Sequence, residues 1–269
     1  MLTTNIINKR GTLMKKTLLA ASVAALAFAP AAYAQNYQME GGLFYSHLDA
    51  DGAKDDNFGL DFTYHINEVS TAGHPLNEAG FLERSTNIGA RFSSWDKQDT
   101  DTISLGGEAF IEDFYVSAGV DFNSNPSGTS DTTDFGVRLG FLPTDGLLLT
   151  LGYDLEEDGN EREDKDLGII SLGGKYVTPL DGEMALNIEA EIGFADDNDD
   201  TVVYTLGGDL YFNSAISAGL WLADSDQSGS KTLVGVRGKY FVTPLVSVEA
   251  AYSKQDKVDT FGLRAALRF

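Results

Sequence analysis

The stretch MALNIEAEIGF, residues 184–194, alternates strictly between apolar side chains and polar or small ones. The apolar face holds Met184, Leu186, Ile188, Ala190, Ile192 and Phe194, and the opposite face holds Ala185, Asn187, Glu189, Glu191 and Gly193. A period of two is typical of a β-strand with one apolar face. The same period recurs along the chain and predicts fourteen strands. They span 37–47, 57–66, 84–95, 101–111, 114–123, 133–142, 147–157, 166–177, 183–195, 201–212, 215–224, 231–242, 246–254 and 257–269.

The length and spacing of these strands favour one architecture. Most have about ten residues, the length that a tilted strand needs to cross a bilayer. Short turns alternate with longer acidic connections such as 48–56 and 196–200, as in barrels with short periplasmic turns and longer extracellular loops. The sequence therefore predicts an all-β fold, a transmembrane antiparallel up-and-down barrel of about 14 strands, with 12 to 16 left open. A soluble β-sandwich also alternates and stays open as an alternative.

Aromatic residues fall near both ends of the predicted apolar faces. Examples are Tyr37, Phe114 and Phe141 at the short-turn ends and Phe122, Phe135 and Tyr153 at the loop ends. Leu, Ile, Val, Ala and Gly lie between them. Two aromatic girdles around an apolar band are typical of a barrel that spans a membrane.

Composition excludes several other classes of protein. The 269 residues include 41 acidic and 19 basic side chains, which gives a formal net charge of −22, and no cysteine. This acidity excludes nucleic acid as a partner, because phosphate binding needs clustered Lys and Arg. The missing cysteines exclude disulfides, thiolate metal sites and Cys nucleophiles.

The N-terminus predicts export. Residues 14–34 contain Lys15 and Lys16, an apolar stretch, and the small-x-small end Ala32-Tyr33-Ala34, which together are typical of a secretory signal peptide. We expect cleavage between Ala34 and Gln35. Residues 1–13 are interpreted as a start-site extension, and residues 35–269 as a single outer-membrane barrel domain.

The chain ends with FGLRAALRF, residues 261–269. Its alternate residues Phe261, Leu263, Ala265, Leu267 and Phe269 resemble the C-terminal insertion signal of Gram-negative outer-membrane proteins. That resemblance implies a location in the outer membrane of a Gram-negative bacterium, reached through the periplasm. It also implies the outer-membrane assembly machinery as a partner.

A second resemblance covers essentially the mature chain. The segment HPLNEAGFLERSTNIGARF, residues 74–92, follows an early strand pair and is similar to a stretch of the putative general porin family of Gram-negative bacteria. This resemblance implies a porin-type barrel.

If the apolar residues face lipid, the alternate set faces the interior. The charged members of this set are the predicted pore-lining residues, nine acidic and seven basic: Glu40, Asp61, Arg91, Glu108, Asp121, Arg138, Asp154, Lys175, Glu189, Glu191, Asp209, Arg237, Lys239, Glu249, Arg264 and Arg268. Fourteen strands enclose more space than side chains fill, since about eight already give an interior that packs. The alternative is a packed interior in which these charges form cross-strand ion pairs. Phe44, Tyr115, Tyr211, Trp221 and Phe241 also point inward, as a stacking track for sugars or as packing.

One connection is unusual. The predicted periplasmic insert, residues 67–83, contains the only helix-like piece, with Pro75 suited to a first helical turn. We expect the insert to pack across or beside the periplasmic mouth and narrow it; a turn that rests on the rim is the alternative.

The sequence offers no catalytic, cofactor or metal site. Its three histidines, His47, His65 and His74, accompany no nucleophile motif, so we expect no enzyme. The acidic loops lack the spacing of a helix-loop-helix calcium site. They still allow divalent ions to bridge them to lipopolysaccharide.

Together these features predict a porin. It would allow passive diffusion of small hydrophilic solutes and ions through a water-filled, mixed-charge lumen. Acidic mouths would make it mildly cation-preferring. The alternative is a non-conducting outer-membrane barrel with a structural, adhesion or receptor role. Expected partners are outer-membrane lipid and lipopolysaccharide, solutes and ions; a homotrimer stays open.

Overall fold

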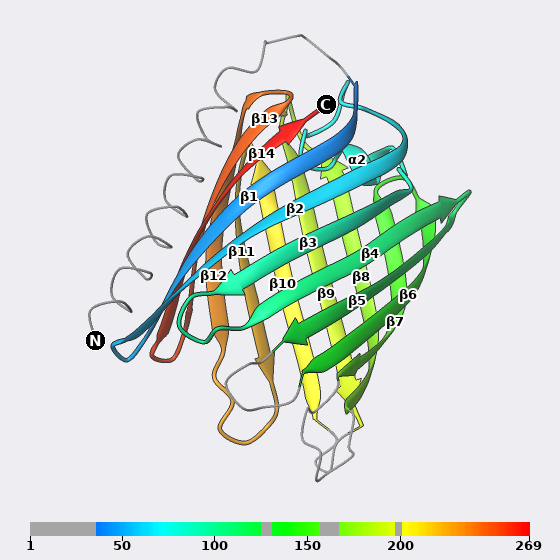
Figure 1. The fold of residues 1–269 in the computed structure, drawn as a ribbon. Helices are drawn as coiled ribbons and strands as arrows, with labels where there is room; N and C mark the ends of the chain where they lie inside the picture. Colours follow the sequence, from blue (N-terminus) through cyan, green and yellow to red (C-terminus); the bar gives the residue numbers. More distant parts are fainter. Residues whose placement is uncertain (1–35, 125–130, 157–166, 197–200) are drawn as a thin grey trace.

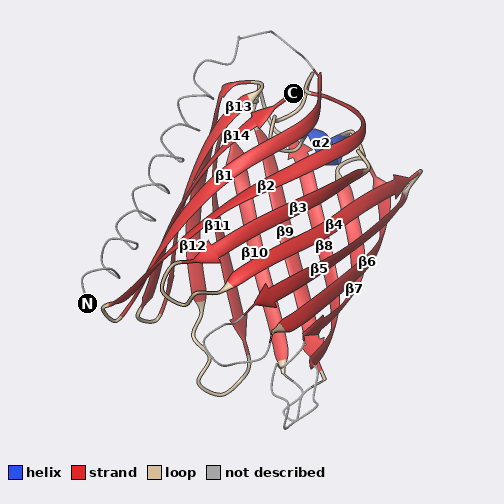
Figure 2. Ribbon diagram, in the orientation of Figure 1, coloured by secondary structure: helices blue, strands red, loops and turns tan. Residues whose placement is uncertain are grey.

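The alternating stretches fold into fourteen antiparallel strands, each paired with its neighbour along the chain (Figures 1 and 2). The computed structural model describes residues 36–124, 131–156, 167–196 and 201–269. The strands are β1 Asn36–Ala50, β2 Ala53–Ser70, β3 Asn87–Trp95, β4 Asp101–Ile111, β5 Phe114–Ser124, β6 Thr132–Thr144, β7 Leu147–Glu156, β8 Leu167–Pro179, β9 Ala185–Ala195, β10 Val202–Tyr211, β11 Ile216–Ser225, β12 Leu233–Thr243, β13 Val246–Gln255 and β14 Val258–Arg268. The predicted signal peptide, its cleavage site and loop residues 197–200 lie outside the described residues.

The sheet closes on itself because the last strand pairs with the first. The register between β1 and β14 runs from Glu40 opposite Arg268 to Ala50 opposite Val258. The backbone of Phe269 extends the ladder, since its carbonyl accepts a hydrogen bond from the Met39 N–H at 2.8 Å. The predicted fold class and the count of fourteen strands are confirmed, and the β-sandwich alternative is wrong.

Apolar side chains lie on the outside of this barrel and polar ones inside. Large exposed residues such as Leu105, Leu139 and Leu220 point away from the interior, whereas Asn187 and Asp209 are buried. This is the reverse of a soluble protein and suits a surrounding lipid phase. Among the described residues, the helical content is one short helix, α2 Ala79–Leu82. It lies at the barrel end where the C-terminus lies (Figure 2). No described helix is long and apolar enough to cross a membrane.

The predicted loop at residues 48–56 is wrong. Strands β1 and β2 continue almost to their shared tip, and only Asp51 and Gly52 form the turn, both with positive φ. Positive φ at both central positions is the geometry of a type I′ hairpin, and Asp-Gly is a preferred pair for it. Asp55 belongs to this ribbon, where its carboxylate accepts backbone hydrogen bonds from Lys97 and Gln98 of the next turn.

The predicted outward orientation of Tyr37 is also wrong. Gln38 and Met39 of β1 both donate backbone hydrogen bonds to the Phe269 carbonyl, which marks a β-bulge in β1, and the pairing with β2 shifts register at the same place. A bulge adds one residue to a strand and reverses which side chains face inward. The Tyr37 ring is therefore buried, 5.3 Å from the His65 ring in an edge-on contact.

An arginine on the outer face of β4 should affect the free energy of unfolding differently from an arginine on the inner face. Leu105→Arg should lower the free energy of unfolding by about 2–4 kcal/mol, the cost of a guanidinium on the lipid face near the bilayer centre. Ser104→Arg is the matched control, because Ser104 points to the opposite face, where it pairs with the inward residues Arg91 and Asp121. Urea unfolding in lipid vesicles measures both, and equal losses would contradict the assignment of faces.

Candidate functional site: the barrel lumen

An open cavity of about 660 Å³ lies along the inner wall formed by β2 to β7. Strand register places charged residues in one row across this wall, because Asp61 is opposite Arg91, and Asp121 is opposite Asp134. The charged residues that line the cavity are Asp61, Arg91, Glu108, Asp121, Asp134, Arg138, Asp154 and Glu156. Six of these eight are carboxylates, so this wall is predominantly acidic.

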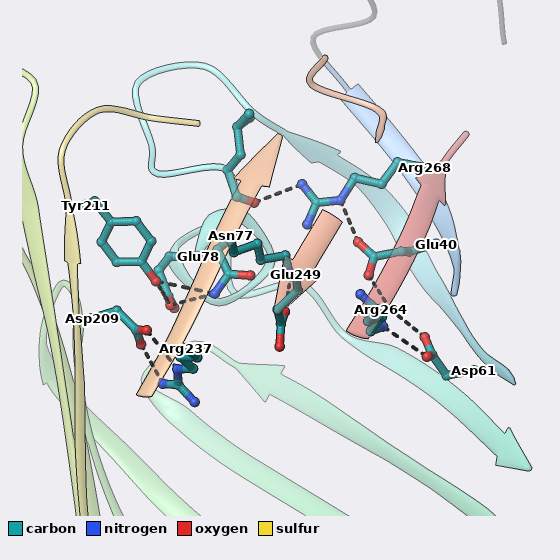
Figure 3. A network of polar contacts seen from close by, with 12 residues as sticks. Glu40, Asp61, Asn77, Glu78, Asp209, Tyr211, Arg237, Glu249, Arg264 and Arg268 are labelled. Atoms are coloured by element: carbon teal, nitrogen blue, oxygen red, sulfur yellow. Dashed lines mark hydrogen bonds and ion pairs between the residues drawn. The ribbon is translucent and has the colours of Figure 1, made fainter. Parts of the chain in front are cut away.

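A first ion-pair network joins the closing strands (Figure 3). Arg264 of β14 contacts Asp61 of β2 at 2.5 Å and Glu40 of β1 at 2.8 Å. Gly42 makes this bridge possible, because a Cβ there would lie 2.7 Å from both the guanidinium and the carboxylate. Arg268, the last residue of β14, contacts Glu40 at 2.6 Å.

Arg138 forms a second network across three strands. Its guanidinium contacts Asp154 of β7 at 3.2 Å and Glu191 of β9 at 3.4 Å. Because Arg138 is on β6, its contact with β9 passes over β7 and β8, so the side chain reaches across the curved wall rather than along one strand pair.

The third network lies on β8 to β13. Lys175 contacts Glu189 at 3.0 Å, and Arg237 contacts Asp209 at 2.5 Å. The side chains of Lys239 and Glu249 are 3.5 Å apart. These pairs surround a small polar cavity of about 190 Å³.

The segment between β2 and β3, residues 71–86, lies at the barrel end where the C-terminus lies (Figure 2) and is called the insert below. Glu78 at its centre is almost fully buried and contacts Lys175 of β8 at 2.8 Å. The Tyr211 hydroxyl of β10 donates a hydrogen bond to the same carboxylate at 2.5 Å. Figure 3 shows Asn77 and Glu78 directed toward Tyr211.

Further contacts hold the insert to the rest of the rim. Arg268 of β14 donates a hydrogen bond to the Leu76 carbonyl at 2.8 Å. Arg84 contacts Asp113 in the β4–β5 turn at 2.8 Å and Asp145 in the β6–β7 turn at 3.2 Å. The insert is therefore attached to strands on several sides of the opening, rather than resting on one edge.

Thirteen of the sixteen charged residues predicted for the lumen take part in the three networks. The other three have different surroundings. The Arg91 guanidinium lies 4.0 Å from the centre of the Phe44 ring, and Glu108 accepts hydrogen bonds from Asn87 and Tyr115. Asp121 lines the large cavity. The interior thus combines the two sequence-based alternatives, ion pairing and open space.

Sequence reasoning missed three charged residues of the interior. Asp134 and Glu156 share the inward parity of Arg138 and Asp154, so strand alternation could have identified them. Glu78 lies in the insert, where no strand period applies, and only its distant partners reveal its role.

Each of the three histidines contacts one polar side chain. His65 contacts the Ser85 hydroxyl at 2.9 Å, but both residues are buried. His47 contacts Asp56, and His74 contacts Glu83 within the insert. Among the described residues, no three His, Asp or Glu side chains are grouped to hold a metal ion.

Comparison with known proteins places this lumen in context. The sequence profile described as "Putative general bacterial porin" matches residues 13–168, more than half of the chain. The crystal structure of Acinetobacter baumannii outer membrane protein Omp33 is 25% identical, with a TM-score of 0.71 and coverage of 87% of this chain and 99% of that chain.

Two more distant structures are a mutant of Rhodopseudomonas blastica porin and the KdgM porin in complex with disordered oligogalacturonate. Each is 10% identical; their TM-scores are 0.49 and 0.46, with coverage of 86% and 85% of this chain and 99% of those chains. No curated protein sequence matches. The extent of the profile match, on a closed fourteen-stranded barrel with a polar interior, shows that this chain belongs to the general bacterial porins of the Gram-negative outer membrane.

Proposed function

We propose that the protein is a narrow diffusion pore for small hydrophilic solutes and ions, with a water-filled lumen of mixed charge and a mild preference for cations. The observation that carries this proposal is the acidic cavity along β2 to β7, with six carboxylates and two guanidinium groups. Transport through it would be passive, with size set by the lumen and selectivity by the charges that line it.

The charged residues of the lumen contribute unequally to the proposed selectivity. An ion pair presents little net charge to a passing ion, because its two fields largely cancel. Asp121 and Glu156 have no basic partner among the described residues, so their fields reach the cavity. Cation preference would therefore come from the β5–β7 wall.

The insert supplies the proposed restriction. It is tied to β8, β10 and β14 through Lys175, Tyr211 and Arg268, which supports a position across the exit. The same observation favours a second candidate, a non-conducting barrel with a structural, adhesion or receptor role. Stepwise currents in planar bilayers would support a pore, and silence from correctly folded protein would support the second candidate.

Selectivity can be tested on the acidic wall. In the double variant Asp121→Asn with Glu156→Gln, the cation-to-anion permeability ratio should fall toward one, because two uncompensated charges are lost. The measurement is the reversal potential under a KCl gradient. Asp181→Asn removes a charge from the exposed β8–β9 turn and should change the ratio little. An unchanged ratio in the double variant would overturn the wall as the source of selectivity.

The restriction can be tested at Glu78. Glu78→Gln combined with Tyr211→Phe removes the buried charge and the hydroxyl that hold the insert, and should raise the mean single-channel conductance severalfold. Glu183→Gln, in the exposed β8–β9 turn, is the control. If this variant and a deletion of residues 73–84 both keep the original conductance, the insert does not restrict the pore.

Export and insertion belong to the same proposal. The mature protein should begin at Gln35, after removal of residues 14–34 by signal peptidase, and the assembly machinery should recognise the terminal strand with Phe269. Mass spectrometry of the protein from the outer-membrane fraction measures the first point. A mature chain that keeps residues 14–34 would contradict it.

A further inference from the structure

We propose that Trp221 and the polar side chains around it form a binding station for a neutral pyranose sugar inside the barrel. The inference rests on the proposed pore function and deepens it by naming a class of solute. Trp221 lies near the middle of β11, so a solute would meet it before reaching the insert.

The indole ring lies flat against the barrel wall. Trp221 is opposite Gly207 of β10 and Gly235 of β12. A Cβ on Gly235 would be 2.2 Å from ring atom Cζ2, so the ring covers this glycine and any side chain there would displace it. One face of the half-buried ring rests on backbone, and the Arg237 guanidinium lies 5.9 Å from the ring centre. Trp221 borders a cavity of about 300 Å³. That volume is at the lower end of small-molecule sites.

The polar neighbours of this cavity are suited to hydroxyl groups. Thr205, Glu189, Arg237 and Glu249 line it together with Trp221. The three charged residues each already have an opposite partner, Glu189 with Lys175, Arg237 with Asp209 and Glu249 with Lys239. The cavity therefore presents oriented donors and acceptors without an uncompensated charge.

This combination favours a neutral sugar over an ion. A pyranose has an apolar face of C–H groups that packs on an aromatic ring, and hydroxyls around its edge that bond to polar side chains. A charged solute would gain little binding free energy, because it would have to compete with the existing ion pairs for each partner.

The other inward aromatic residues do not offer such a face. Phe44, Tyr211 and Phe241 are buried, and the Tyr115 ring packs against the Phe110 ring with centroids 5.1 Å apart. The Arg91 guanidinium lies 4.0 Å from the centre of the Phe44 ring, closer than the 5.9 Å between the Arg237 guanidinium and the centre of the Trp221 ring. The sequence-based idea of a continuous stacking track thus reduces to one site at Trp221.

The first measurement is fluorescence. In Trp95→Phe protein, folded in detergent, Trp221 is the only tryptophan, and glucose or maltose should change its emission in a saturable way at millimolar concentrations. Glucuronate and glucosamine should bind more weakly than glucose. Tighter binding of either charged sugar would overturn the assignment to neutral sugars.

The second measurement is ionic current in planar bilayers with sugar added. Glucose should interrupt the current of the wild type and of Trp95→Phe, the matched aromatic control. Trp221→Leu should weaken this block at least about tenfold, since a stacking face is lost, while the sugar-free conductance persists. Gly235→Ala keeps the indole but displaces it, and should weaken the block too. Heat-dependent gel migration verifies that each variant is folded.

The outcomes separate this inference from the proposed function. Normal conductance without a saturable fluorescence change, or with an equal block in Trp221→Leu, overturns the sugar station and leaves the pore intact. Saturable fluorescence without any conductance refutes the pore but supports the station.

Discussion

Closure of the sheet between β1 and β14 is the constraint on which the rest of the structure depends. A bilayer offers no water to an unpaired backbone N–H or C=O group, so a spanning sheet must have no free edge. The eleven residue pairs from Glu40–Arg268 to Ala50–Val258 remove that edge. Closure also fixes which side chains face inward, because successive side chains of each strand point alternately to the lipid and to the interior.

The interior charges follow from that arrangement. A charge that is partly removed from water is costly unless it is paired and hydrogen-bonded. Along β8 to β13 the barrel meets this cost with ion pairs such as Arg237–Asp209 and Lys175–Glu189. Along β2 to β7 it pairs Asp61 and Asp154 with arginines, and it leaves other carboxylates beside an open cavity in which they can stay hydrated. The two halves of one lumen thus handle their charges in different ways.

Strand alternation made most of the fold predictable. All fourteen strands could be assigned from a period of two, because the lipid face demands an apolar side chain at nearly every second position. The same period supplied the sixteen charged residues predicted for the lumen. The bulge that turns Tyr37 inward breaks the period and leaves no mark in the sequence. The buried position of Glu78 was equally hidden, since it depends on Lys175 and Tyr211, which lie far along the chain. The ion pairs within the lumen could not be predicted for the same reason, because they join residues on different strands.

The contact between Arg268 and the insert has a consequence for the order of assembly. The insert is encoded early in the chain, yet its Leu76 carbonyl is held by the last residue of the last strand. Arg268 reaches that position only in register with Glu40 of the first strand. Sealing of the barrel and docking of the insert are therefore thermodynamically linked, and a nascent barrel that is still open at its seam lacks this anchor. The final strand therefore both closes the barrel and holds the insert in place.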